Sequence, residues 1–132
     1  MRIIAGKHKG RKINIPTDRS ARPTRPMIRE AIFSILCSGE FVGENGLSII
    51  ENSIVLDLFA GSGSFAVEAL SRGANKAILV DNNKDNINLA RSNLESIGEL
   101  QNAYLIGCDV EKLLPAKVQV DLVFIDPPYH QN

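Results

Sequence analysis

The sequence has few of the residues that form disulfides and metal sites. It contains two cysteines and two histidines in 132 residues. Cys37 and Cys108 are far apart and show no Cys-x-x-Cys spacing, and His8 and His130 are isolated, so we expect reduced thiols and no bound metal. No apolar stretch approaches the length of a membrane span or follows a basic leader. These absences argue against a disulfide scaffold, a metal centre or a membrane protein, and we expect a cytoplasmic protein with a single core.

The net charge of zero hides an uneven distribution of charge. Residues 1–29 hold nine of the fifteen lysines and arginines against one acid, Asp18, so the rest of the chain is acidic. A basic segment on an acidic body is expected to bind phosphate backbones, while the acidic body accepts a cationic ligand. The residues that we expect to contact RNA are Lys7, Lys9, Arg11, Lys12, Arg22 and Arg25.

The basic segment also has the pattern of a β-hairpin. Gly6 and Gly10 are flanked by apolar positions, as a hairpin requires, namely Ile3, Ile4, Ile13 and Ile15. The alternative is a solvated, disordered arm. We therefore predict a basic hairpin and loop over residues 1–23, followed by a second domain over residues 24–132.

Apolar periodicity in residues 24–132 places strands and helices in alternation. A helix begins after Thr24, with an apolar face of Met27, Ile28, Ala31, Ile32, Ile35 and Leu36. Beyond a polar connection, strands are predicted at 54–58, 77–81, near 103–106 and at 120–125, and the helices after the first two of these end before Gly73 and Gly98. Such alternation predicts an α/β domain with a Rossmann-like, doubly wound and mostly parallel sheet.

A glycine loop follows the first strand of this domain, at residues 57–66 (DLFAGSGSFA). Glycines let the backbone approach a ligand closely, and the N–H groups at the start of the next helix attract anionic groups. The run from Gly61 to Ala66 also matches the dinucleotide fingerprint, with Asp81 in the place of the ribose-binding acid. The loop thus indicates an adenosine-containing ligand without identifying it.

Charge favours a cofactor other than a dinucleotide. Asp57, Asp81, Asp109 and Asp126 all follow predicted strands, so they meet at one edge of a parallel sheet, and no lysine or arginine stands beside them. A pyrophosphate would be repelled there. S-adenosylmethionine offers a sulfonium and an ammonium for Asp57, ribose hydroxyls for Asp81 and an adenine amine for Asp109. The alternative for Asp109 is that it only caps a helix that begins at Val110.

The last predicted strand ends in Asp-Pro-Pro-Tyr at residues 126–129. Two prolines hold an extended turn that is poor in hydrogen-bond donors. In such a turn the Asp126 carboxylate and the Pro127 carbonyl can accept both N–H bonds of a nucleobase amine, while Tyr129 stacks on the ring. The alternative is a strand-ending turn with an incidental tyrosine.

Through these segments the chain resembles the class I S-adenosylmethionine-dependent methyltransferases. Residues 2–13 (RIIAGKHKGRKI), 22–24 (RPT) and 29–33 (REAIF) narrow the resemblance to the bacterial enzymes that modify guanine N2 in small-subunit (16S) ribosomal RNA, over nearly the whole chain. The resemblance implies that the target guanine is held by Asp126, Pro127, Pro128 and Tyr129. It further implies that the cofactor is bound by Asp57, Phe59, Ala60, Gly61, Ser62, Gly63, Asp81, Asn82, Asp109 and Val110. One departure is the pair Asp81-Asn82, where a glutamate is more usual in first position.

The resemblance implies a sheet with more strands than the sequence accounts for, so we expect an incomplete class I methyltransferase fold. The strand at 120–125 would then be an open edge, which can pair with another chain. Three functions stay open. The first is a ribosomal RNA guanine-N2 methyltransferase that acts on the RNA or on the small-subunit particle. The second is a DNA adenine-N6 methyltransferase, and the third is a noncatalytic remnant that binds nucleic acid or cofactor.

Overall fold

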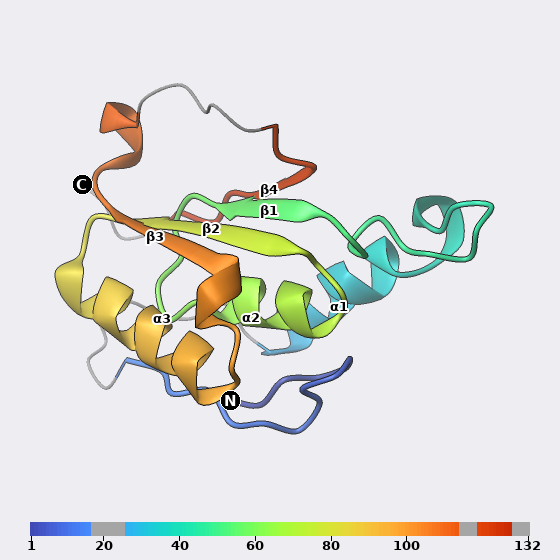
Figure 1. The fold of residues 1–132 in the computed structure, drawn as a ribbon, viewed down its shortest axis with the longest axis horizontal. Helices are drawn as coiled ribbons and strands as arrows, with labels where there is room; N and C mark the ends of the chain where they lie inside the picture. The colour runs from blue at the N-terminus through green and yellow to red at the C-terminus, as the bar shows by residue number, and fades with distance from the viewer. Residues whose placement is uncertain (17–25, 114–118, 128–132) are drawn as a thin grey trace.

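A parallel four-stranded sheet forms the centre of the protein (Figure 1). The structure is a computed structural model, and it describes residues 1–16, 26–113 and 119–127. Its strands are β1 (Ile54–Asp57), β2 (Lys76–Asp81), β3 (Ala103–Gly107) and β4 (Leu122–Phe124). The helices are α1 (Pro26–Leu36), α2 (Ser64–Ser71) and α3 (Lys84–Ser96), with the short 3-10 turns η1 (Gly39–Phe41), η2 (Leu100–Asn102) and η3 (Val110–Lys112). The predicted α/β architecture is confirmed, and the strands lie within a few residues of their predicted positions.

The strand order β3-β2-β1-β4 changes direction at β1. The chain proceeds outward from β1 through β2 to β3 and then crosses back, so that β4 pairs with the free side of β1 in parallel. A parallel sheet opens a crevice at such a reversal, outside the carboxyl ends of the two strands. From this topology alone we expect the ligand crevice beyond Asp57 and Phe124.

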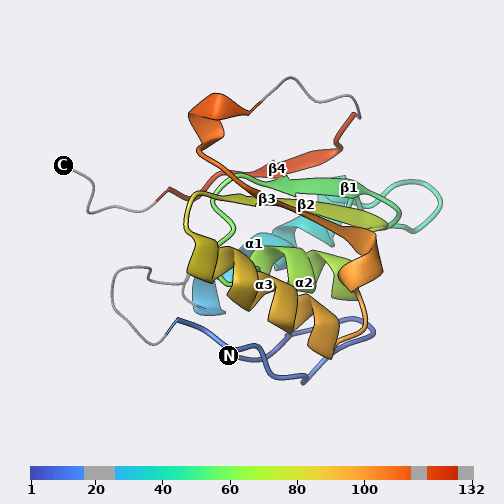
Figure 2. The same cartoon turned by 60° about the vertical axis from the view of Figure 1, so that its left-hand side comes forward.

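Figures 1 and 2 show α2 and α3 on one face of the sheet and residues 1–16 beyond them, on the side away from the sheet. All eight residues of α2 are buried, including the polar residues Ser64, Glu68 and Ser71. A surface helix buries only one face. The burial of α2 on every side follows from its position between the sheet and this N-terminal segment, which we call the arm (residues 1–16).

The arm pairs with itself in an antiparallel manner. Arg2 and Lys12 form an isolated antiparallel β-bridge. Ile3 N donates to Arg11 O at 2.9 Å, and Ile13 N donates to Met1 O at 2.8 Å. Ile3 and Ile13 are buried in the same core as the sheet, whereas Ile15 is exposed. The predicted hairpin is therefore confirmed for residues 1–13, and the boundary predicted at residue 23 lies outside the described residues.

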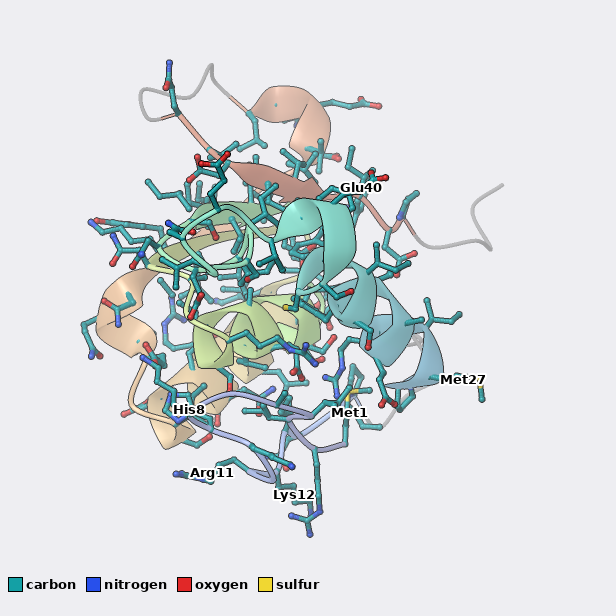
Figure 3. All side chains as sticks on the ribbon, turned by 90° about the vertical axis from the view of Figure 1, so that its right-hand side faces the viewer. Met1, His8, Arg11, Lys12, Met27 and Glu40 are labelled. Carbon is teal, nitrogen blue, oxygen red and sulfur yellow. The ribbon has the colours of Figure 1, made fainter. Side chains whose placement is uncertain are left out.

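The predicted apolar face of α1 is correct only for Ile32 and Leu36. The residues of α1 that are fully buried are Arg29 and Phe33, with Ile32 and Leu36 packed partly against the core. Met27, Ile28, Ala31 and Ile35 are exposed, and Met27 projects outward (Figure 3). The reason is that an arginine occupies part of the buried face, where it meets a buried carboxylate, so hydrophobicity alone centred the face on the wrong residues.

That carboxylate is Glu68, which joins three elements. It accepts hydrogen bonds from Ile4 N at 2.9 Å, Ala5 N at 3.2 Å and Arg72 Nε at 2.8 Å, and Arg29 Nε lies 4.0 Å away. Arg29 in turn donates to Arg2 O at 2.6 Å. Burial lowers the pKa of Arg29, and the nearby Glu68 charge opposes this shift. The arm, α1 and α2 are thus held together by one buried, charged network.

Gly6 fixes the tip of the arm against α2. A Cβ at Gly6 would lie 2.0 Å from Ser71 O, and Lys7 N donates to this oxygen at 2.8 Å. Gly10 lies in the same hairpin with a similar positive φ, 84° against 88°, but a Cβ there would meet nothing within 4 Å.

We expect Gly6→Ala to lower the free energy of unfolding by about 2–3 kcal/mol more than Gly10→Ala, because both changes strain the backbone but only the first displaces the arm from α2. Urea unfolding of the two variants measures the difference. Equal losses would show that the close contact at Ser71 O is relieved by a small shift of the arm.

Within the part of the chain that the structure describes, no helix is long and apolar enough to cross a membrane. Cys37 and Cys108 form no disulfide in the structure. Strand β4 pairs with β1 and with no other described strand, and Val123 and Ile125 are exposed. Pairing of this strand with another chain stays a prediction.

Candidate functional site

The site is built at the carboxyl ends of β1, β2 and β4. Asp57 ends β1, Asp81 ends β2, and Asp126 follows β4 by two residues. Asp57 is in register with Leu79 of β2 and Phe124 of β4, so the three carboxylates come from adjacent strands. The predicted convergence of these acids at one edge of the sheet is what the strand register produces, because parallel strands end on the same side.

Asp57 is the most perturbed of these acids. It is 1% exposed, its Oδ1 accepts from Phe59 N at 3.2 Å, and its Oδ2 has no hydrogen-bond partner among the described residues. Burial raises the pKa of Asp57 to about 7, and the charges of Asp126 and Asp81 add to the shift, while the bond from Phe59 opposes it. A buried carboxylate with an unused oxygen is costly to ionise, and a cationic ligand would offset that cost.

The glycine loop turns back over the end of β1. Ala60 N donates to Val80 O at 2.9 Å, Gly61 N to Asp81 Oδ2 at 2.9 Å, and Gly63 N to Ala60 O at 2.9 Å. Gly61 and Gly63 have φ of 55° and 84°, values that favour glycine. The loop is therefore held by hydrogen bonds to β2 and by a turn of its own.

The two glycines of the loop have different roles. A Cβ at Gly63 would lie 3.2 Å from Ala90 Cβ and 3.3 Å from Leu79 Cδ2, so Gly63 is needed for the contact between the loop, α3 and the sheet. A Cβ at Gly61 would meet no atom of the described residues within 4 Å. Among those residues, the space above Gly61 is therefore open to a ligand.

We expect Gly61→Val to leave the chain folded and to abolish cofactor binding, because the side chain would fill the open space above the loop. The backbone strain should cost about 1–3 kcal/mol of stability. Gly46→Ala is the control for strain, since Gly46 also has positive φ and open space around it. Calorimetric titration with S-adenosylhomocysteine measures the effect, and unchanged affinity in folded Gly61→Val protein would refute the role of the loop.

Asp81 stabilises the local structure through hydrogen bonds, and it also lies at the predicted crevice. Besides Gly61 N, it accepts from Asn83 N at 2.8 Å and Asn86 Nδ2 at 3.3 Å. Its side chain joins the loop after β1 to the start of α3, and the neighbouring Asn82 is exposed. Phe59 is half-buried, and Ala60 and Ser62 are buried within the loop.

Asp109 and Val110 begin the turn η3 after β3. Asp109 occupies the position before the first residue of η3, but its side chain makes no capping hydrogen bond, so the capping alternative has no support in the geometry. Asp109 is exposed and Val110 half-buried. Both remain predicted cofactor contacts.

The Asp-Pro-Pro-Tyr turn is described in part. Asp126 is half-buried and close enough to Asp57 to raise its pKa, and Pro127 is exposed. Pro128 and Tyr129 lie outside the described residues, so the expected stacking of a base on Tyr129 stays a prediction. Leu58 N donates to Phe124 O at 3.1 Å, which anchors the end of β4 beside the glycine loop.

Two of the basic residues expected to bind RNA make contacts within the protein. Lys7 Nζ lies 3.0 Å from Glu99 Oε2, beside His8 Nε2 at 2.6 Å from the same oxygen, and Arg11 Nη2 donates to Ser96 O at 2.5 Å. Burial opposes ionisation of Glu99, but hydrogen bonds from His8, Asn102 and Lys7 outweigh it and lower the pKa of Glu99. These contacts dock the arm onto the end of α3.

The arm docks at the end of the sheet opposite to Asp57, Asp81 and Asp126. Glu99 precedes η2 and β3, so it lies at the amino end of the sheet. Lys9 and Lys12 are exposed, and Figure 3 shows Lys12 and Arg11 on the outer side of the arm. Arg22 and Arg25 lie outside the described residues. RNA contacts at all these positions stay predictions, and any contact at the tip would be distant from the crevice.

Sequence reasoning missed three buried polar residues, Glu68, Asn93 and Glu99. A signal was present for Glu68, which interrupts the otherwise apolar and small-residue helix SFAVEALS. Asn93 and Glu99 carried no such signal, because their partners come from the arm, about eighty and ninety residues earlier in the chain. Among the described residues, no group of three or more histidines, cysteines and acids is arranged to hold a metal ion.

Known proteins resemble this chain over its whole length. Residues 1–132 match the family described as conserved hypothetical protein 95. A protein of Bacillus subtilis named putative rRNA methyltransferase YlbH is 36% identical over all of this chain and 68% of its own length. Ribosomal RNA small subunit methyltransferase D of Haemophilus influenzae is 35% identical, and this chain covers 65% of it.

A solved structure agrees with these sequence matches. The putative methyltransferase YhhF of Escherichia coli has a TM-score of 0.79 and 30% identity, over 98% of this chain and 65% of that one. The chain therefore spans about two thirds of the length of these relatives.

Proposed function

The chain belongs to the conserved hypothetical protein 95 family and has the class I methyltransferase fold, and from this we propose that it transfers a methyl group from S-adenosylmethionine to the N2 amine of a guanine in small-subunit ribosomal RNA. The observation that carries the proposal is the buried Asp57 carboxylate with an unused oxygen, set beside a glycine loop with open space above Gly61. This pair of features suits a ligand with a cationic group close to an adenosine.

The residues of the crevice fit S-adenosylmethionine in their chemistry. Asp57 Oδ2 would accept a hydrogen bond from the ammonium of the cofactor, and the Gly61–Gly63 loop would leave room for its methionine moiety. Asp81 would accept hydrogen bonds from the ribose hydroxyls. When bound, the cofactor supplies a methyl group activated by a sulfonium. Binding would favour the ionised form of Asp57, because a nearby cation lowers the pKa of a carboxylate.

Asp126 would hold the target amine close to Asp57. Its carboxylate and the Pro127 carbonyl would each accept one N–H bond, which fixes the nitrogen in line with the methyl group. Asp126 would also stabilise the positive charge that develops on the nitrogen as the sulfur–methyl bond breaks and S-adenosylhomocysteine leaves, and the nitrogen would then lose one proton to water. Positioning and charge together would thus carry the catalysis. Tyr129 would stack on the base and Pro128 would hold the turn rigid.

Two other functions are distinguished from this one by experiment. An adenine amine in DNA presents the same pair of N–H bonds to Asp126 and Pro127, so the turn alone does not select guanine. A noncatalytic remnant would bind nucleic acid or cofactor without transferring a methyl group. The names of the relatives favour ribosomal RNA as the substrate over DNA.

Calorimetry with S-adenosylmethionine and with NAD, followed by transfer of a labelled methyl group to small-subunit RNA and to DNA, tests the proposal. We expect binding of S-adenosylmethionine only, and label in N2-methylguanine after digestion of the RNA. Label in N6-methyladenine of DNA would support the second function. Cofactor binding without transfer to either nucleic acid would support the third, and binding of NAD alone would overturn the cofactor assignment.

We expect Asp126→Ala to lower methyl transfer about 100-fold or more at saturating cofactor, because the loss falls on the chemical step, and to spare cofactor affinity. The measurement is best made at pH 8, where Asp57 is largely ionised in both proteins. Asp85→Ala, an exposed acid of α3, is the control. Transfer by Asp126→Ala at the rate of the parent would exclude this residue from the site.

A further inference from the structure

Asn93 lies at the junction of the arm, α3 and the glycine loop. It is 3% exposed on α3. Its Nδ2 donates to Asn14 O at 2.9 Å and to Ser62 O at 2.8 Å, and its Oδ1 accepts from Asn14 N at 3.0 Å. One buried amide is therefore bonded to the exit of the arm on one side and to the loop on the other.

The bond to Ser62 O controls a peptide plane of the loop. That oxygen belongs to the peptide between Ser62 and Gly63, whose N–H donates to Ala60 O at 2.9 Å. Because a peptide is planar, fixing its carbonyl and its N–H at once fixes its orientation. Gly61 and Gly63, on either side of Ser62, both have positive φ and have few steric restraints of their own. Asn93 therefore supplies a restraint that the glycines do not.

The arm is attached to the rest of the protein at two distant places, its tip and its exit. Its tip is held at Lys7, whose N–H donates to Ser71 O, and at His8 by Glu99, near the end of α3. Its exit is held by the paired bonds between Asn14 and Asn93, beside the loop. Movement of the arm at its tip can thus reach the loop through the single side chain of Asn93.

We propose that Asn93 is a positioning residue that transmits the docking of the arm to the glycine loop, so that the loop keeps its binding shape only while the arm is in place. The consequence for ligand affinity rests on the proposed function, whereas the effect on the loop itself does not. Coupling of this kind is reciprocal, so a ligand that orders the loop must also order the arm.

Amide hydrogen exchange in the ligand-free protein tests the proposal directly. The variants are Gly6→Ala, Asn93→Ala and the double variant, with Gly10→Ala and Asn88→Ala as controls at an open glycine and an exposed asparagine of α3. The readout is exchange at Gly63 N relative to Cys37 N, which is bonded within the α1 region. A merely structural loss of stability would speed both amides alike.

We expect Gly6→Ala to speed exchange at Gly63 relative to Cys37 by about fivefold or more, and to add nothing in the Asn93→Ala background. Equal effects of Gly6→Ala with and without Asn93, or no effect on Gly63, would overturn the proposal. If Asn93→Ala does not fold, Asn93→Asp serves instead, because it keeps the acceptor for Asn14 N and loses the donor to Ser62 O.

Calorimetric titration of the same variants with S-adenosylhomocysteine gives the second measurement. We expect Gly6→Ala to weaken binding about fivefold in the parent and not in the Asn93→Ala background. Failure of the parent to bind this ligand would overturn the proposed function and leave the exchange result to decide the role of Asn93. Additive effects on affinity would overturn the coupling.

Discussion

Replacing Asp57 with asparagine is expected to remove about 4 kcal/mol of pH dependence from the stability of the ligand-free protein. The pKa of Asp57 is raised from 3.8 to about 7 in the folded chain by burial and by the charges of Asp126 and Asp81. The folded state therefore binds this proton more tightly than the unfolded state. The stabilisation is fully present below pH 4 and is lost as the pH rises to 7.

Urea unfolding of the parent and of Asp57→Asn between pH 4 and pH 8 measures the effect. The free energy of unfolding of the parent should fall relative to that of the variant across this range, while the exposed-site variant Asp85→Asn should follow the parent. Parallel curves for the parent and Asp57→Asn would show that Asp57 ionises normally when folded.

The same substitution should weaken binding of S-adenosylhomocysteine roughly 10- to 100-fold, because a charge-assisted hydrogen bond to the ammonium is lost. A stabilised protein that no longer binds would identify Asp57 as a residue kept for function at a cost in stability. Unchanged affinity in the variant would place the cationic group of the ligand elsewhere in the crevice.

The second large effect is expected at Glu68. Changing Glu68 to glutamine should lower the free energy of unfolding by about 3–5 kcal/mol, because removal of one partner leaves the buried Arg29 without a countercharge. The new amide group would also face the N–H groups of Ile4 and Ala5, which now donate to the carboxylate.

Urea unfolding and hydrogen exchange at Ile4 and Ala5 check this expectation. Glu95→Gln, at an exposed position of α3, is the matched control and should change stability by less than about 0.5 kcal/mol. A loss below about 1 kcal/mol at Glu68, with the arm amides still protected, would mean that packing rather than charge holds the arm.

The buried network around Glu68 also gives part of the N-terminal motif a structural role. Residues 29–33 (REAIF) helped to place the chain among ribosomal RNA methyltransferases, and Arg29 counted toward the basic surplus. In the structure Arg29 is fully buried and Phe33 packs against Phe65 and Phe124, with ring centroids 6.1 Å and 5.6 Å away. This part of the motif serves the fold.

The arm likewise has a structural role beside any contact with RNA. Lys7, His8 and Arg11 dock it at the end of α3, far from the acidic crevice. Positive charge in the sequence is a sum over residues and does not distinguish a side chain that pairs internally from one that faces solvent. Lys9 and Lys12, both exposed, are the positions in the described arm where a phosphate contact is best tested.

The architecture and the convergence of three acids at one end of the sheet could be predicted from the amino-acid sequence. Alternating apolar segments and glycine stops are local signals, and they predicted the β-α-β order to within a few residues. Parallel strands must end on the same side of a sheet, so the convergence of Asp57, Asp81 and Asp126 follows from the order of the strands. These properties depend on residues close together in the chain.

The tertiary structure alone decided which charges are buried and what they hold. The face that α1 buries depends on Glu68, the loop is restrained by Asn93 from α3, and the raised pKa of Asp57 depends on its burial and on two other strands. Each of these interactions joins residues that are distant in sequence, and its energy depends on distance and on exclusion of water. Hydrophobic periodicity contains neither quantity, which is why it gave the order of the elements and missed the polar contacts between them.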